Sequence, residues 1–117
     1  MLRKPRMQHT AIAVLITLTF SLFGFSESAI AEYQLLDHIV AIVEAAGGKI
    51  DDITRLTWFV IDKKEYLAKQ REVGAAYRRV MGRHYPAMSV LVVAGLIEDE
   101  ALVEIEATAE IGSAAST

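Results

Sequence analysis

The sequence has no cysteine among its 117 residues, only two prolines and only three histidines. Without cysteine the chain has no disulfide bond, no thiolate zinc ligand and no cysteine nucleophile. The histidines His9, His38 and His84 are scattered along the chain and give a metal site little to build on. We therefore predict no metal site.

The sequence also has no basic stripe, because the charges that give its formal net charge of -3 are spread along the chain. Proteins that track a phosphate backbone usually carry a basic stripe or patch. We therefore predict no nucleic acid partner. Hydrophobic residues make up 53% of the sequence, which is too high a share for a disordered chain, so this length predicts one folded domain.

The first 31 residues have the organisation of an export signal. Three basic residues lie within the first six positions, and residues 11–25 form an uncharged apolar run that is short for a bilayer span. Ala29 and Ala31 then supply the small-x-small pattern that a signal peptidase requires. The pattern predicts cleavage before Glu32 and a periplasmic or secreted product with no stable membrane insertion. The alternative is a cytoplasmic protein whose start site is assigned too far upstream.

The region 32–111 is predicted to be the folded domain, and residues 112–117 a flexible tail. In chain order, the predicted elements are a helix at 32–46, a strand at 53–61, a helix at 62–82, and strands at 88–96 and 101–111. Gly47 and Gly48 supply the stop of the first helix. Asp62 and Glu65 have the spacing of a capping box at the start of the second.

A strand, a long helix and another strand favour a parallel pair joined by a crossover, with the last strand antiparallel beside the second. The predicted fold class is therefore an α+β sandwich with the helices on one face of the sheet. In the last strand, alternation places Glu104 and Glu106 on the face opposite Val103 and Ile105. Such a pair of carboxylates can equally belong to a solvated face.

Three stretches carry a resemblance to a known family. They are LDHIVAIVEAAGG, ending the first helix, YPAMSVLVVAGL, leading into the second strand, and VEIEATAEI in the third. Together they resemble the Rid family of reactive intermediate deaminases, also called the YjgF family, over Gln34 to Ile111. The resemblance implies a chorismate-mutase-like α+β fold, a homotrimer, and small-molecule pockets in clefts between subunits. It also implies hydrolysis of enamines and imines without metal or cofactor.

The same resemblance assigns site residues. In the family, the first glutamate of EIEA helps to position the attacking water, so Glu104 is the predicted catalytic residue. An arginine directly after the PA turn holds the substrate carboxylate, but this chain has Met88 there. Met88 and Val90 are the predicted substrate contacts. A thioether cannot replace a guanidinium, so the pocket is expected to prefer an apolar or neutral ligand. Met88 can also simply fill space.

A second departure concerns the region before the first helix. Family members begin with a β-hairpin, and here the signal-like segment takes its place, so both strands are predicted to be missing and the fold truncated. An exported, shortened variant and a fragment joined to unrelated sequence both fit this pattern. Two functions remain open: an enamine or imine deaminase with altered or weakened specificity, and a non-catalytic trimer that binds small molecules or proteins. Some family members are labelled endoribonucleases, but the acidic chain argues against tight RNA binding.

Overall fold

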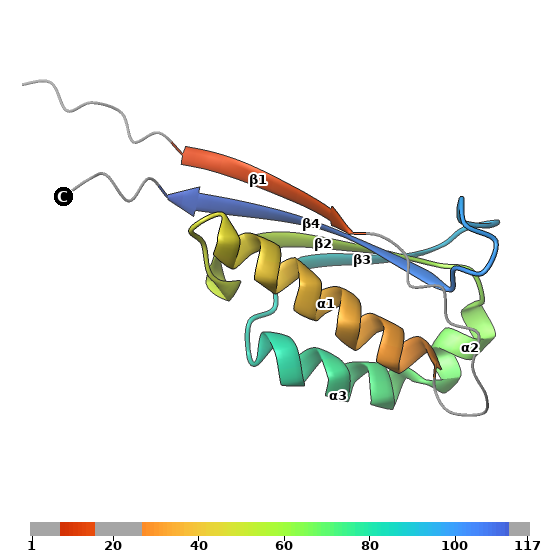
Figure 1. Ribbon diagram of the computed structural model, residues 1–117. Coiled ribbons are helices and arrows are strands. Elements are labelled where there is room, and N and C mark those ends of the chain that lie inside the picture. Colours follow the sequence, from red (N-terminus) through yellow and green to blue (C-terminus); the bar gives the residue numbers. More distant parts are fainter. Residues whose placement is uncertain (1–7, 16–26, 113–117) are drawn as a thin grey trace, which may run out of the picture.

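The computed structural model describes residues 8–15 and 27–112, which form a mixed sheet with helices on one side (Figure 1). The sheet has four strands in the order β1-β4-β2-β3. These strands are β1 (Gln8–Leu15), β2 (Ile53–Val60), β3 (Ala87–Val92) and β4 (Val103–Gly112). The predicted α+β class, with helices on one face, is confirmed.

The predicted parallel pairing of the strands at 53–61 and 88–96 is confirmed, since β2 and β3 are parallel. The predicted place of the last strand is wrong, because β4 pairs antiparallel with β2 and not with β3. The burial of the strands explains this order. Alternate residues of β4 are buried, whereas all six residues of β3 are exposed. The alternating strand lies inside the sheet under the helices, and the mainly apolar strand β3 lies at its edge.

Strand β1 corrects the expectation that no strand precedes the first helix. It runs antiparallel to β4, with a register from Gln8 opposite Gly112 to Leu15 opposite Ile105. Part of the signal-like segment thus forms one strand in the region where the family has a β-hairpin. Residues 1–7 and 16–26 of that segment, and the tail after Gly112, lie outside the described residues, so cleavage before Glu32 stays a prediction.

The helices differ from the prediction at their ends. Helix α1 (Glu27–Ala45) begins five residues earlier than the expected start at Glu32, and a short 3-10 turn, η1 (Ile50–Asp52), follows it. The second predicted helix is divided into α2 (Lys63–Ala68) and α3 (Gln70–Met81). Lys69 lies between them with φ of -108° and ψ of 9°, outside the helical region, and ends one helix where the next begins.

Local signals at two helix ends work as the sequence indicates. Gly47 has a φ of 90°, and the backbone N–H groups of Gly47 and Gly48 donate to the carbonyls of Glu44 and Val43. This is the Schellman arrangement, which satisfies the last carbonyls of α1. At the start of α2, the Asp62 carboxylate accepts from the backbone N–H of Glu65 at 3.0 Å.

The core lies between the sheet and helices α1 and α3, which Figure 1 shows on the same side of the sheet. Its fully buried large side chains come from α1, β2 and β4: Leu35, Leu36, Ile39, Val43, Ile53, Leu56, Val103 and Ile105. The residues of β4 predicted to share one face are therefore those that pack beneath α1. Within residues 8–15 and 27–112, no helix has the length and apolar character needed to cross a membrane.

Candidate functional site

Met88 and Val90 lie on β3, on the face of the sheet that carries the helices. Met88 is in register with Leu56, and Val90 with Trp58, both of which are buried beneath the helices. Met88 and Val90 themselves remain 42% and 41% exposed. Because β3 is the edge strand, the helix layer covers it less completely than it covers β2. The two predicted substrate contacts are therefore neighbours on one open flank.

A hollow of about 290 Å³ lies on this flank, between β3 and α3. Its wall is mainly apolar and aromatic, and it consists of Trp58, Tyr66, Gln70, Val73, Gly74, Tyr77, Arg78, Tyr85, Met88 and Val90. The five residues from α3 recur at intervals of three and four, so they form one stripe of that helix. The volume is near the lower end of the range for small-molecule sites, about 300–1,000 Å³.

Three aromatic side chains give this hollow a rigid wall. The rings of Tyr77 and Tyr85 are stacked with centroids 5.3 Å apart, and the rings of Trp58 and Tyr77 are 6.4 Å apart. The Tyr77 hydroxyl donates a hydrogen bond to the carbonyl of His84, and the Nε2 of His84 donates to the carbonyl of Ile53 at 2.7 Å. These two bonds connect α3, the turn before β3 and the start of β2.

The Tyr77 hydroxyl keeps its proton at neutral pH. Burial, and to a smaller extent the neighbouring Tyr85, raises the pKa of Tyr77 from 10.0 to about 12. The phenol therefore acts as a hydrogen-bond donor to the loop and not as a general base. Its part in this site is to hold the turn that leads into Met88.

Trp58 also lines the hollow, and its indole carries a buried polar group. Its ring is 3% exposed, and its Nε1 is buried with no hydrogen-bond partner among the residues that the structure describes. A buried donor without a partner costs about 1–3 kcal/mol. This indole is the one tryptophan of the sequence, so it also offers a fluorescent reporter in the wall of the hollow.

Glu104 lies on the other face of the sheet. It is in register with Phe59 of β2, and Glu106 with Thr57, whereas Ile105 between them is fully buried under the helices. Both carboxylates are half-buried. Since successive side chains of a strand alternate between faces, Glu104 and Met88 do not meet within one subunit. The predicted shared site can only form if a second subunit brings the two faces together.

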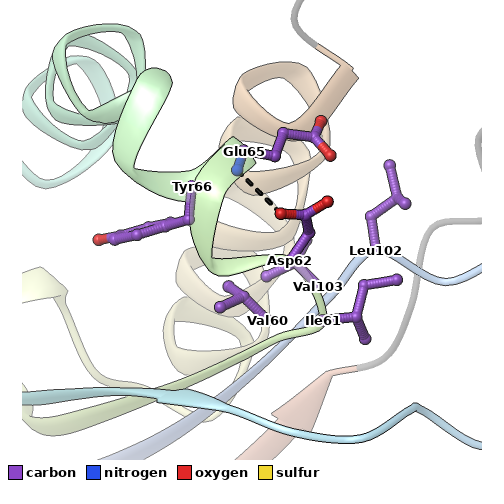
Figure 2. A pocket seen from close by; sticks show the side chains of 7 residues that line it. All are labelled: Val60, Ile61, Asp62, Glu65, Tyr66, Leu102 and Val103. Atoms are coloured by element: carbon purple, nitrogen blue, oxygen red, sulfur yellow. Dashed lines mark hydrogen bonds between the residues drawn. The ribbon is translucent and has the colours of Figure 1, made fainter.

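A second cavity, of about 20 Å³, lies where β2 leads into α2 (Figure 2). That is close to the space of one water molecule, since about 10–15 Å³ of such volume is needed to hold one. Figure 2 shows the Asp62 carboxylate in this cavity bonded to the backbone of Glu65, so it serves the start of the helix. In the described part of the chain, no group of three or more His, Asp or Glu residues has the arrangement of a metal site.

The sequence identified only one wall of the hollow. Val73 and Tyr77 lie in the helix predicted at 62–82, but Trp58, Arg78 and Tyr85 were not predicted as site residues. Their convergence depends on β3 lying at the edge of the sheet. A sheet order placing β3 inside gives no reason to expect an open flank there.

Comparison with known proteins gives a consistent family. A family model described as endoribonuclease L-PSP matches residues 26–111. A 2-iminobutanoate/2-iminopropanoate deaminase of Escherichia coli K12 is 42% identical over 79 residues, covering 65% of this chain and 58% of that protein. UK114, a RutC family protein of Drosophila melanogaster, is 37% identical over 80 residues, covering 68% of this chain and 54% of that protein. The chain therefore spans less than two thirds of the length of these curated relatives.

Solved structures show the same fold. A member of the YjgF/YER057c/UK114 family from Mycobacterium tuberculosis superposes with a TM-score of 0.65 at 29% identity, covering 86% of this chain and 79% of the other. E. coli TdcF, solved with bound serine, superposes with a TM-score of 0.61 at 31% identity, covering 73% of this chain and 65% of the other.

Proposed function

Because this chain belongs to the endoribonuclease L-PSP family, also called YjgF or Rid, we propose that it is a deaminase of enamines or imines with altered specificity. The observation that carries the proposal is the 42% identity to the 2-iminobutanoate/2-iminopropanoate deaminase of E. coli. The reaction adds water across the C=N bond of an imine and then expels ammonia, leaving a carbonyl compound. It needs a positioned water and a proton acceptor.

Glu104 is the group proposed to position that water and to accept its proton. Its carboxylate is half-buried on the open face of the sheet, and strand β4 is held on both sides by β1 and β2. A carboxylate on a strand within the sheet has little freedom to move, which favours a fixed water. Glu106 lies one strand repeat further on the same face and provides a matched comparison.

The altered specificity is proposed from Met88. A small 2-imino acid carries its carboxylate beside the C=N bond, and a charged group there needs a cation or donors when it leaves water. Met88 provides a polarisable thioether instead of the guanidinium that the family pattern has at this place. Imines that are apolar next to the reacting carbon therefore suit this wall better than 2-iminobutanoate does.

A homotrimer is proposed because Glu104 and Met88 can share one site only across a contact between subunits. Glu104 and Met88 lie on opposite faces of one subunit, so a neighbouring copy must bring its own face to the hollow. Strand β3 supports this assembly, because Val90, Leu91 and Val92 are 41–53% exposed on an edge strand. Exposed apolar edges are usually covered by a partner. Sedimentation that shows a stable folded monomer at micromolar concentration would contradict the trimer.

Export is proposed separately from the reaction. The basic start, the apolar run and the alanines before Glu32 support it, and N-terminal sequencing of protein from an extracytoplasmic fraction should then begin at Glu32. Recovery of a soluble cytoplasmic protein that still begins at Met1 would count against it.

The reaction is tested by ammonia release from imines generated freshly in the assay. The full chain should accelerate hydrolysis of an imine without a carboxylate more than that of 2-iminobutanoate. Replacing Met88 with Arg should raise the rate with 2-iminobutanoate by about tenfold or more, the scale of a charge-assisted pair. Met88→Leu keeps the apolar surface and should leave the wild-type preference unchanged.

A folded protein that accelerates neither imine, before or after Met88→Arg, would overturn the enzymatic proposal. The second candidate function, a non-catalytic trimer that binds small molecules, would then be favoured. The specific observation behind that candidate is the hollow of about 290 Å³, which exists independently of Glu104.

A further inference from the structure

The hollow between α3 and β3 contains a cation that the proposed reaction does not use. Arg78 is an exposed residue of α3 and lines the hollow. Among the described residues, its guanidinium has no hydrogen bond or ion pair. Its neighbour Arg79 differs, because the Arg79 guanidinium lies 5.5 Å from the centre of the Tyr33 ring, and Arg79 is not part of the wall.

The guanidinium of Arg78 lies close to the backbone of Gly74. Glycine inside a helix costs about 1 kcal/mol relative to alanine, and Gly74 lies in the interior of α3 one turn before Arg78. A β-carbon at Gly74 would come within 3.3 Å of Nη1 of Arg78. The guanidinium therefore lies across the bare backbone of Gly74, and both residues contribute to the wall.

The remaining wall has a different chemistry. Tyr77 and Tyr85 form a stacked pair, and Met88 and Val90 supply exposed apolar surface on the facing strand. The buried Nε1–H of Trp58 has no partner in the described part of the protein. One side of the hollow thus suits an aromatic or apolar body, and the α3 side suits a negative charge.

We propose that this hollow binds a small carboxylate with an aromatic or bulky apolar body, whose carboxylate is held by Arg78. A planar guanidinium matches a carboxylate through two parallel hydrogen bonds. Arg78 is the single cation among the residues of the hollow, so a monoanion matches the charge better than a phosphate dianion.

This inference deepens the proposed function, because it places the anionic group of the substrate at α3 and not at position 88. The substrate class becomes imines of aromatic or bulky apolar carboxylic acids. Binding at the hollow does not depend on the chemistry at Glu104.

The test uses 3-phenylpropanoate and its uncharged analogue 3-phenylpropanamide, titrated against the full-length protein with Trp58 fluorescence as the readout. The acid should bind about tenfold more tightly than the amide, the lower end of what a charge-assisted bond provides at a partly exposed site. Arg78→Gln should remove that difference. Arg79→Gln, one residue away on the same helix, should keep it.

Equal binding of acid and amide to the wild type, or an acid preference that survives Arg78→Gln, would overturn the inference. The inference would also be overturned if millimolar ligand caused no fluorescence response and calorimetry detected no binding. The protein in this experiment must have a native circular dichroism spectrum. Neither probe contains a C=N bond. Arg78-dependent binding without any imine hydrolysis would therefore disprove only the proposed reaction. Imine hydrolysis without Arg78-dependent binding would disprove only the binding site proposed here.

Discussion

Replacing Glu104 with Gln is expected to lower the rate of imine hydrolysis by about 10²–10⁴-fold, the usual contribution of a positioned proton-transfer group. The amide has nearly the shape of the carboxylate, so the strand and its neighbours should be unaffected. It cannot accept a proton from the attacking water. The measurement is ammonia release from a freshly generated imine, with the variant and the wild type at equal concentration.

Glu106→Gln is the matched control for this result. Glu106 lies on the same strand and the same face, is also half-buried, and differs from Glu104 by one strand repeat. It should retain most of the wild-type rate, and both variants should unfold at the same urea concentration as the wild type. Equal activity losses in the two variants would mean that the open face contributes through its general charge, and Glu104 would lose its assigned role.

Replacing Ile105 with Ala is expected to lower the free energy of unfolding by about 2–5 kcal/mol. Ile105 is 0% exposed and lies in β4, between two neighbouring strands and beneath the helices. Removing three carbon atoms there leaves a cavity that the surrounding strands cannot close. For a domain whose total stability is about 5–15 kcal/mol, such a loss is a large part of the whole. Urea denaturation followed by circular dichroism measures it.

Ile42→Ala makes the same chemical change on the outer side of α1. Ile42 is 40% exposed, so the substitution leaves no cavity and should change the free energy of unfolding by about 0.5 kcal/mol or less. If both alanine variants lost the same stability, Ile105 would not be in the centre of the core. The order of the strands would then need to be revised.

The elements that carry a local signal could be predicted from the sequence. The alternation in β4 identified its buried face, and the glycines after α1 and the aspartate before α2 marked helix ends. The division at Lys69 could not be predicted, because the helical spacing of apolar residues continues across it and a single non-helical residue leaves no trace in that pattern. The boundaries of β3 were extended too far, since the apolar run to Leu96 continues beyond the last residue that pairs with β2.

Pairing between distant segments accounts for the larger errors. Neighbouring strands in a chain often pair, and this rule placed β4 beside β3. The position of β4 between β1 and β2 depends on pairing between residues that are far apart in the sequence, such as Gln8 and Gly112. Hydrophobic periodicity is a local pattern and does not predict such pairing. The prediction of the site residues was incomplete for the same reason. Met88 and Val90 lie in the hollow as a pair, but Arg78 and Trp58 join them only because β3 is at the edge.

The origin of β1 has a consequence for how the chain is made. Residues of β1 pair with the last residues of β4, so the partner of Gln8 is Gly112. At a synthesis rate of about 5–20 residues per second, roughly 5–20 s pass between the emergence of the two strands from the ribosome. During that interval β1 has no strand to pair with, because β4 is its neighbour in the sheet order β1-β4-β2-β3. This edge strand can therefore join the sheet only after nearly all of the chain has been synthesised.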